Sequence, residues 1–156
     1  LLKILLIERY GIEPDWIECP PNLSSMLDVA DAALLIGDPV FPHLDSNISS
    51  IDLAEEWFLH TGYPFVFAIW VGRPGSIDEQ TKESILASKE SGINLIPEIA
   101  NKYAQENGGD VALYTKYMKE HICYHLGPSE IEGLQLFFDK ALRHGLISKA
   151  PELLYY

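Results

Sequence analysis

The sequence has few positively charged residues. Its 156 residues include 11 Lys and Arg against 23 Asp and Glu, which gives a formal net charge of −12 at pH 7. A nucleic-acid-binding protein needs a basic surface that displaces phosphate counterions, and no basic stripe occurs along this sequence. Nucleic acid is therefore not expected as a partner, whereas a small anion can still bind to backbone N–H groups or a helix N-terminus in an acidic protein.

Cysteine is also scarce, and the sequence has no long apolar run. The two cysteines, Cys19 and Cys123, are far apart and lack CxxC spacing, so neither a disulfide scaffold nor a thiolate metal site is expected. This usage fits a reducing compartment, and we expect a cytoplasmic protein. The longest apolar run, residues 65–71, is much shorter than the roughly 20 residues that a membrane helix needs.

The sequence does contain enough apolar residues for a packed core, since 47% of its residues are hydrophobic. Residues 1–10 predict a helix that is already under way at the first residue, and Gly11 is placed to end it as a left-handed cap. We therefore expect the sequence to begin part-way through a longer protein.

Three short segments have the pattern of β-strands: residues 15–19, 32–36 and 65–71. The connection between the first two, residues 20–31, contains a helical segment at 22–29 and is long enough for a parallel crossover. The sequence therefore predicts a βαβ unit and an α/β fold.

The rest of the pattern is mostly helical. Three capping boxes predict helix starts: Asp52 with Glu55, Ser76 with Glu79, and Ser129 with Glu132. These helices are expected to end near Gly62, Gly92 and Gly145. Helical patterns also cover residues 93–107 and 111–120, and Pro97 either kinks the first of these or starts a new helix.

The candidate substrate-binding site is Ile36, Gly37 and Asp38, with Asp38 as the candidate catalytic residue. A strand that ends in Gly-Asp would place a carboxylate and exposed amides at the carboxyl edge of a parallel sheet, where ligands of open α/β folds bind. The alternative role is structural, because Asp38 can cap a helical turn that begins at Pro39. The two roles can also coexist.

Two other patterns resemble catalytic or metal motifs. His121 and His125 have the H-x-x-x-H spacing of two zinc ligands on one helical face, but His125 lies in an extended segment and no Glu follows His121. We predict no metal site. Glu55 and Glu56 are adjacent on a helix and point about 100° apart, so they cannot converge on one substrate bond.

Three strings together resemble one family: DAALLIGD at residues 31–38, DLAEEWFLHTGYPFVFAIW at 52–70, and YHLGPSEIEGLQLFFDKALRHGLI at 124–147. They are similar to the chorismate dehydratases of the futalosine route to menaquinone, and the resemblance runs the length of the chain. It implies a type II periplasmic-binding-protein-like fold, in which two α/β lobes close over a ligand, with the N-terminal segment missing. Residues 1–62 would belong to the second lobe, and residues 63–156 would return to the first lobe with a buried strand and the C-terminal helices.

The resemblance also implies a function. Ile36 to Asp38 would face the cleft between the lobes, and Gly37 and Asp38 stand where the related dihydroxynaphthoate synthases have a catalytic histidine. The implied enzyme is a lyase that removes water from chorismate, a small anionic substrate, to give 3-[(1-carboxyvinyl)oxy]benzoate without a cofactor. It would be cytoplasmic, with no nucleic acid or membrane as partner and a homodimer as one option.

Two other functions stay open at this point. One is a non-catalytic solute-binding protein for a small carboxylate, because fold does not fix function. The other is a structural or partner-binding fragment with no ligand of its own. We expect these 156 residues alone to be inactive, because half of the implied cleft would be missing.

Overall fold

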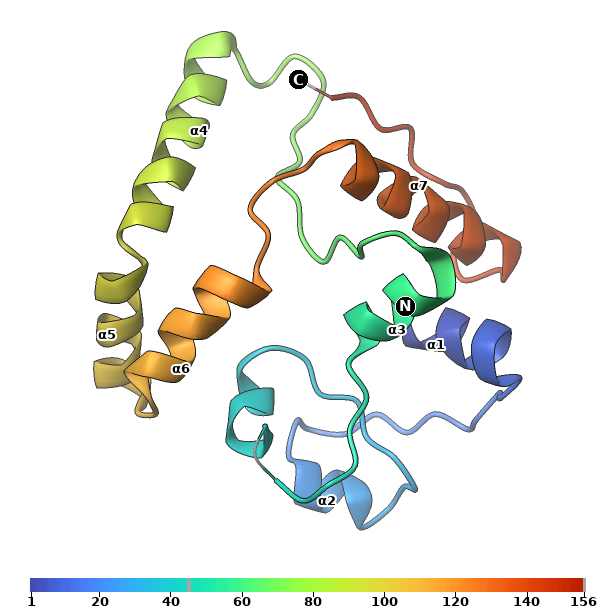
Figure 1. Cartoon of the computed structure of the whole chain (residues 1–156). Coiled ribbons are helices and arrows are strands. Elements are labelled where there is room, and N and C mark those ends of the chain that lie inside the picture. The colour runs from blue at the N-terminus through green and yellow to red at the C-terminus, as the bar shows by residue number, and fades with distance from the viewer. Residues whose placement is uncertain (45, 156) are drawn as a thin grey trace. The chain divides into compact units, whose positions relative to one another are not determined.

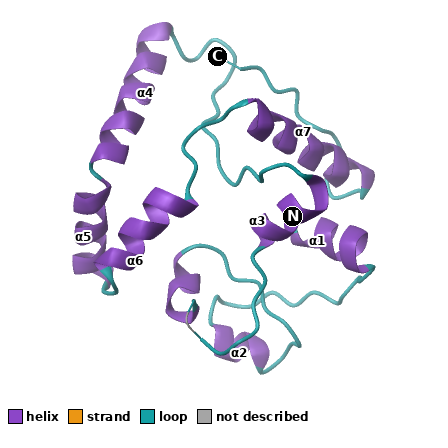
Figure 2. Ribbon diagram, in the orientation of Figure 1, coloured by secondary structure: helices purple, strands orange, loops and turns teal. Residues whose placement is uncertain are grey.

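The computed structural model describes residues 1–44 and 46–155, and every regular element in that part of the chain is helical (Figures 1 and 2). The predicted α/β fold, with its βαβ unit and two lobes, is therefore wrong. The segments expected as strands, residues 15–19, 32–36 and 65–71, form no ladder within the described residues. Apolar alternation is a local signal, whereas a strand exists only where a second segment pairs with its backbone.

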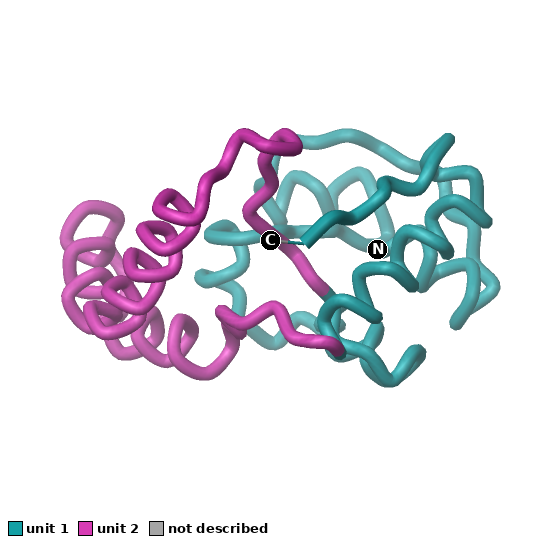
Figure 3. Tube along the Cα trace, turned by 90° about the horizontal axis from the view of Figure 1, so that it is seen from above, with its two compact units in different colours: residues 1–65, 129–156 teal, residues 66–128 magenta. Residues whose placement is uncertain are grey.

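The chain divides into two compact units (Figure 3). Unit 1 comprises residues 1–65 and 129–156, and unit 2 comprises residues 66–128. The division of the chain expected after residue 62 stays a prediction. Within the described residues, no helix is both long and apolar enough to cross a membrane.

Unit 1 contains the helices at both ends of the described chain and four other described elements between them. They are α1 (Leu2–Leu5), the π-helical turn η1 (Leu6–Tyr10), α2 (Leu23–Leu27), the 3-10 helix η2 (Asp38–His43), α3 (Leu53–Thr61) and α7 (Pro128–Arg143). Gly11 ends the first helix with φ 64°, in the left-handed cap predicted for it. Asp52 caps α3 by accepting hydrogen bonds from the N–H groups of Ala54 and Glu55.

The core of unit 1 lies where α1, α3 and α7 meet. Ile4, Leu5, Trp57 and Ala141 are buried there, and Phe65 and Phe137 pack against them. The Trp57, Phe65 and Phe137 rings contact one another edge to face, with the Phe65 and Phe137 centroids 5.0 Å apart. This geometry suits the aromatic quadrupole, and it joins residues that are far apart in sequence.

Unit 2 contains α4 (Glu79–Asn94), α5 (Ile96–Asn107), α6 (Val111–Lys116) and the π-helical turn η3 (Tyr117–His121). Pro97 lies in the first turn of α5, so it starts a new helix rather than kinking one. The core of unit 2 contains Ile96, Ala100 and Tyr114. The Tyr114 hydroxyl donates to the Gly108 carbonyl at 3.1 Å, which holds the turn between α5 and α6.

Two of the three predicted capping boxes are wrong. Asp78, not Ser76, caps α4, because its carboxylate accepts from the Thr81 N–H at 2.8 Å. The Ser76 hydroxyl instead donates to the Arg73 carbonyl within the preceding turn. α7 begins at Pro128, so Ser129 lies inside the helix. Serine and aspartate both suit the cap position, and the sequence pattern does not rank two neighbouring candidates.

Candidate functional site

The predicted site at residues 36–38 lies at the start of η2 on the surface of unit 1. Ile36 is 74% exposed, and Gly37 occupies the cap position with φ 71° and ψ −144°, a conformation that is largely confined to glycine. Asp38 is exposed and lies in the first turn of η2, which begins one residue earlier than the expected start at Pro39. The structure thus brings these three residues to one exposed turn, but not to the edge of a sheet.

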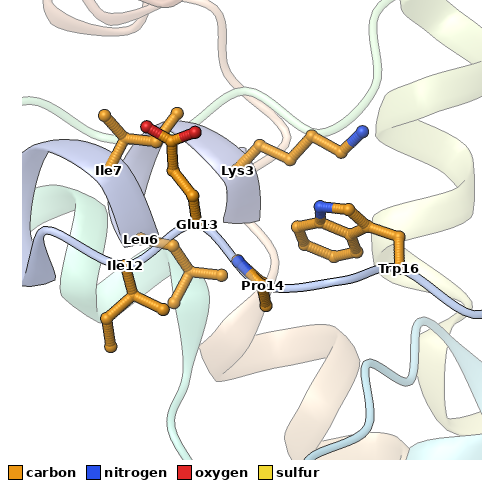
Figure 4. Close-up of a pocket in the computed structure, with 7 residues that line it drawn as sticks. All are labelled: Lys3, Leu6, Ile7, Ile12, Glu13, Pro14 and Trp16. Carbon is orange, nitrogen blue, oxygen red and sulfur yellow. The ribbon is translucent and has the colours of Figure 1, made fainter.

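A second place, the Trp16 hollow, is a cavity of about 180 Å³ beside the first helix. It is lined by Lys3, Leu6, Ile7, Ile12, Glu13, Pro14 and Trp16 (Figure 4). The Lys3 ammonium lies 4.9 Å from the centroid of the Trp16 ring, within the range of a cation–π contact. The lining of the hollow combines a cation, a carboxylate and an aromatic face.

The most connected polar group in the described part of the chain is a cluster of four side chains in unit 1, which we call the Glu8 clamp: Glu8, His60, Lys140 and His144. The Glu8 carboxylate lies 2.9 Å from His60 Nε2 and 2.8 Å from His144 Nε2, and it pairs with the Lys140 ammonium. All four side chains are mostly buried. The clamp therefore ties η1 to α3 and to the C-terminal end of α7.

The clamp changes the acidity of its carboxylate. Burial raises the pKa of Glu8, but hydrogen bonds from Lys140, His60 and His144, together with the charge of Lys140, outweigh burial and lower the pKa to about 2. Glu8 is therefore ionised at any physiological pH. A carboxylate held by three donors is a poor proton acceptor, so the clamp is suited to fastening helices rather than to general base catalysis.

A second ion pair adjoins the clamp and uses the next two residues of η1. Arg9 Nε lies 2.7 Å from the Glu56 carboxylate of α3, and the Tyr10 hydroxyl donates to the same carboxylate. This hydrogen bond, followed by burial, raises the pKa of Tyr10. Three consecutive residues of η1 thus each have a charged partner on another helix.

Acid is expected to release the Glu8 clamp. The pKa of Glu8 is about 2 in the folded protein against an ordinary value of 4.5. The ionised carboxylate therefore adds stability that is complete above the ordinary value and is lost as the pH falls toward 2. Urea unfolding of the wild type and Glu8→Gln should show a difference in unfolding free energy that is largest above about pH 5 and shrinks in acid. A difference as large at pH 3 as at pH 7 would contradict this.

Within the described residues, the histidines outside the clamp belong to no group that could hold a metal ion. His121 ends η3, and its ring centroid lies 6.0 Å from that of Tyr117. In residues 1–44 and 46–155, no three or more His, Cys, Asp or Glu side chains are grouped so that they could hold a metal ion. Cys19 and Cys123 are both free thiols.

The comparisons with known proteins identify the family. A family model described as menaquinone biosynthesis matches residues 1–143. The chain belongs to this family. The chorismate dehydratase of Thermus thermophilus is 29% identical over 155 residues, which cover 88% of this chain and 56% of that protein. This member of the menaquinone biosynthesis family therefore spans about half the length of the curated relative, and the family that the three sequence strings predict is confirmed.

The Glu8 clamp and the Trp16 hollow are not among the sites that the sequence predicts. His60 and His144 do lie near the C-terminal ends of α3 and α7, where their positive form suits the helix dipole. Glu8 and Lys140, however, are 132 positions apart, and no local pattern connects them. The signal that could have found the clamp is the presence of Lys140 and His144 at i and i+4 on one helical face.

Proposed function

We propose that this member of the menaquinone biosynthesis family acts in the dehydration of chorismate to 3-[(1-carboxyvinyl)oxy]benzoate. The observation that carries the proposal is the match to a chorismate dehydratase across 88% of this chain, together with the family match over residues 1–143. A cytoplasmic location and a lyase that uses no cofactor belong to the same proposal.

The proposed reaction is an elimination in which atoms and electrons balance without an oxidant. One proton leaves a ring carbon of chorismate, the ring hydroxyl leaves as water, and the electron pair of the broken C–H bond completes an aromatic ring. The protein has to orient a dianion, accept the ring proton and assist the departing hydroxyl. These tasks need a cation or N–H donors beside a carboxylate that is able to take a proton.

Asp38 is the group that we propose to act on the ring, with Ile36 and Gly37 as substrate-binding neighbours. Asp38 is an exposed residue in the first turn of η2, so a substrate can reach it. Glu8 is less suited to this task because three donors already hold its carboxylate. General base catalysis by a positioned carboxylate typically contributes about 100-fold or more to the rate.

The proposal is tested by incubating chorismate with two purified proteins, the product of the complete coding sequence and the 156-residue chain. The first is expected to consume chorismate and release one aromatic product per molecule consumed, as followed by chromatography and absorbance. The second is expected to be inactive. Chorismate that binds to the complete product but is not consumed would favour a solute-binding protein and contradict the dehydratase.

The role of Asp38 is tested separately in the complete product. Asp38→Asn is expected to lower kcat by about 100-fold or more, because the amide cannot accept the ring proton. Asp28→Asn changes an exposed aspartate that follows α2 and is the matched control, with no change expected. If Asp38→Asn turned over at the wild-type rate, Asp38 would have no part in proton transfer, whatever the outcome for the reaction itself.

A further inference from the structure

The turn that ends the first helix is wider than the Schellman form of a glycine cap. The Gly11 N–H donates to the Ile7 carbonyl at 3.2 Å and also to the Leu6 carbonyl, and the Ile12 N–H donates to the Leu6 carbonyl at 2.9 Å. In the common Schellman cap, the Gly11 N–H would bind the Glu8 carbonyl and the Ile12 N–H would bind the Ile7 carbonyl. The chain is therefore shifted by one residue from the common cap, and such π-type turns are rare.

Side-chain contacts explain why η1 takes this wider form. Consecutive side chains of an α-helix point about 100° apart, yet Arg9 and Tyr10 both reach the Glu56 carboxylate. Glu8, just before them, is held by the clamp. A wider turn reduces the angle between neighbouring side chains, so the contacts with α3 and α7 stabilise it against the common cap.

The same turn connects the two walls of the Trp16 hollow. Lys3, Leu6 and Ile7 form the wall on the helix, and the facing wall is formed by Ile12, Glu13, Pro14 and Trp16 (Figure 4). A change of one residue in the hydrogen bonding of η1 would move the second wall relative to the first. The Lys3 ammonium lies on the first wall and the Trp16 ring on the second, 4.9 Å apart, so the distance between them depends on the position of the two walls.

We propose that η1 is a two-state conformational switch whose wide form is held by the carboxylates of Glu8 and Glu56 and sets the shape of the Trp16 hollow. When either carboxylate loses its partners, the turn adopts the common cap and the hollow changes shape. A contact that is made in only one of two conformations stabilises that conformation. Removing the contact therefore shifts the equilibrium toward the other conformation by the free energy of the contact. The proposal concerns the conformation of unit 1 and does not depend on chorismate dehydration.

The test is NMR spectroscopy of three variants of the 156-residue chain. Glu56→Gln weakens the contacts of Arg9 and Tyr10, and Tyr10→Phe removes one hydroxyl with little risk to folding. Glu106→Gln is the control, because Glu106 forms only a long 3.9 Å ion pair with Lys102 on the exposed surface of α5. Two quantities are measured: the hydrogen exchange rate of the Ile12 amide, and the chemical shifts of the Lys3 side chain, which the Trp16 ring current displaces.

Glu56→Gln is expected to speed exchange at Ile12 by about tenfold, the effect of losing a hydrogen bond to a charged group. Tyr10→Phe should change it in the same direction by less. In both variants the Lys3 shifts should move toward those of a lysine away from any ring, while Glu106→Gln changes neither quantity. The proposal is overturned if exchange and Lys3 shifts stay at wild-type values, or if exchange rises equally throughout α3 and α7, which would indicate a general loss of stability.

Discussion

A Trp57→Ala variant is expected to lose about 3–5 kcal/mol of unfolding free energy. Trp57 is fully buried, and its ring contacts those of Phe65 and Phe137, which come from two other parts of unit 1. Alanine would remove the side chain that joins α3 to α7 and leave a cavity that the surrounding rings cannot fill. Urea unfolding followed by circular dichroism measures the loss.

Trp70→Ala is the matched control, because Trp70 is 85% exposed whereas Trp57 is 0% exposed. Its substitution should change the unfolding free energy by less than about 0.5 kcal/mol. Trp57→Phe should cost less than Trp57→Ala. The buried Trp57 Nε1 has no hydrogen-bond partner among the described residues, so phenylalanine removes volume without breaking a hydrogen bond. Equal effects of Trp57→Ala and Trp70→Ala would show that the aromatic cluster does not stabilise unit 1.

A Gly133→Ala variant is expected to be destabilised by about 2 kcal/mol, although alanine is the better helix former. Gly133 is buried in α7, and a Cβ at this position would overlap with the Pro64 carbonyl oxygen. The obstacle is backbone just beyond the end of α3, so it cannot move aside as a flexible side chain would. The gain of about 1 kcal/mol from helix propensity is too small to offset this overlap.

Gly92→Ala gives the comparison, because Gly92 is also inside a helix but has nothing within 4 Å of the added Cβ. At Gly92 only the higher helix propensity of alanine acts, so the unfolding free energy should rise by about 0.5–1 kcal/mol. The two glycines should therefore respond with opposite signs in thermal unfolding. A stabilised Gly133→Ala variant would mean that residues 63–64 lie farther from α7 than the structure places them.

Local signals in the sequence predicted several helix ends correctly, although two of the three capping boxes are wrong. The left-handed position of Gly11 and the Asp52 cap were predicted, and for Pro97 the start of a helix was one of two alternatives; each of these depends on residues within one turn of the chain. Such features are set by the conformational limits of glycine and proline and by short-range hydrogen bonds. They hold whatever the rest of the chain does.

Features that depend on distant residues were predicted poorly. Residues 65–71 have the composition of a buried strand, yet Trp70 is 85% exposed, and the segment forms no strand in the described part of the chain. Strand formation requires a partner, and the sequence pattern contains no information on whether one is adjacent. The Glu8 clamp was missed for the same reason, because it joins Glu8 to side chains of α3 and α7 that are distant in the sequence.

The candidate site at residues 36–38 was predicted from an expected sheet edge that is absent from the described residues. Gly37 nevertheless adopts a conformation that few other residues allow, and Asp38 is exposed beside it. The residues therefore form a defined turn, but a sheet edge does not position them. The family was predicted correctly because it depends on matching strings, not on the fold inferred from them.

The acidic composition has a further consequence when the helix starts are considered together. The carboxylates of Asp52, Asp78 and Asp110 accept hydrogen bonds from backbone N–H groups at the first turns of α3, α4 and α6. At Asp78, hydrogen bonds from Thr81 lower the pKa of the carboxyl group. Part of the net charge of −12 therefore neutralises helix dipoles rather than only keeping molecules apart. A variant designed to be less acidic, for crystallisation or for binding to an anionic resin, should lose surface carboxylates such as Glu106 and keep these three aspartates.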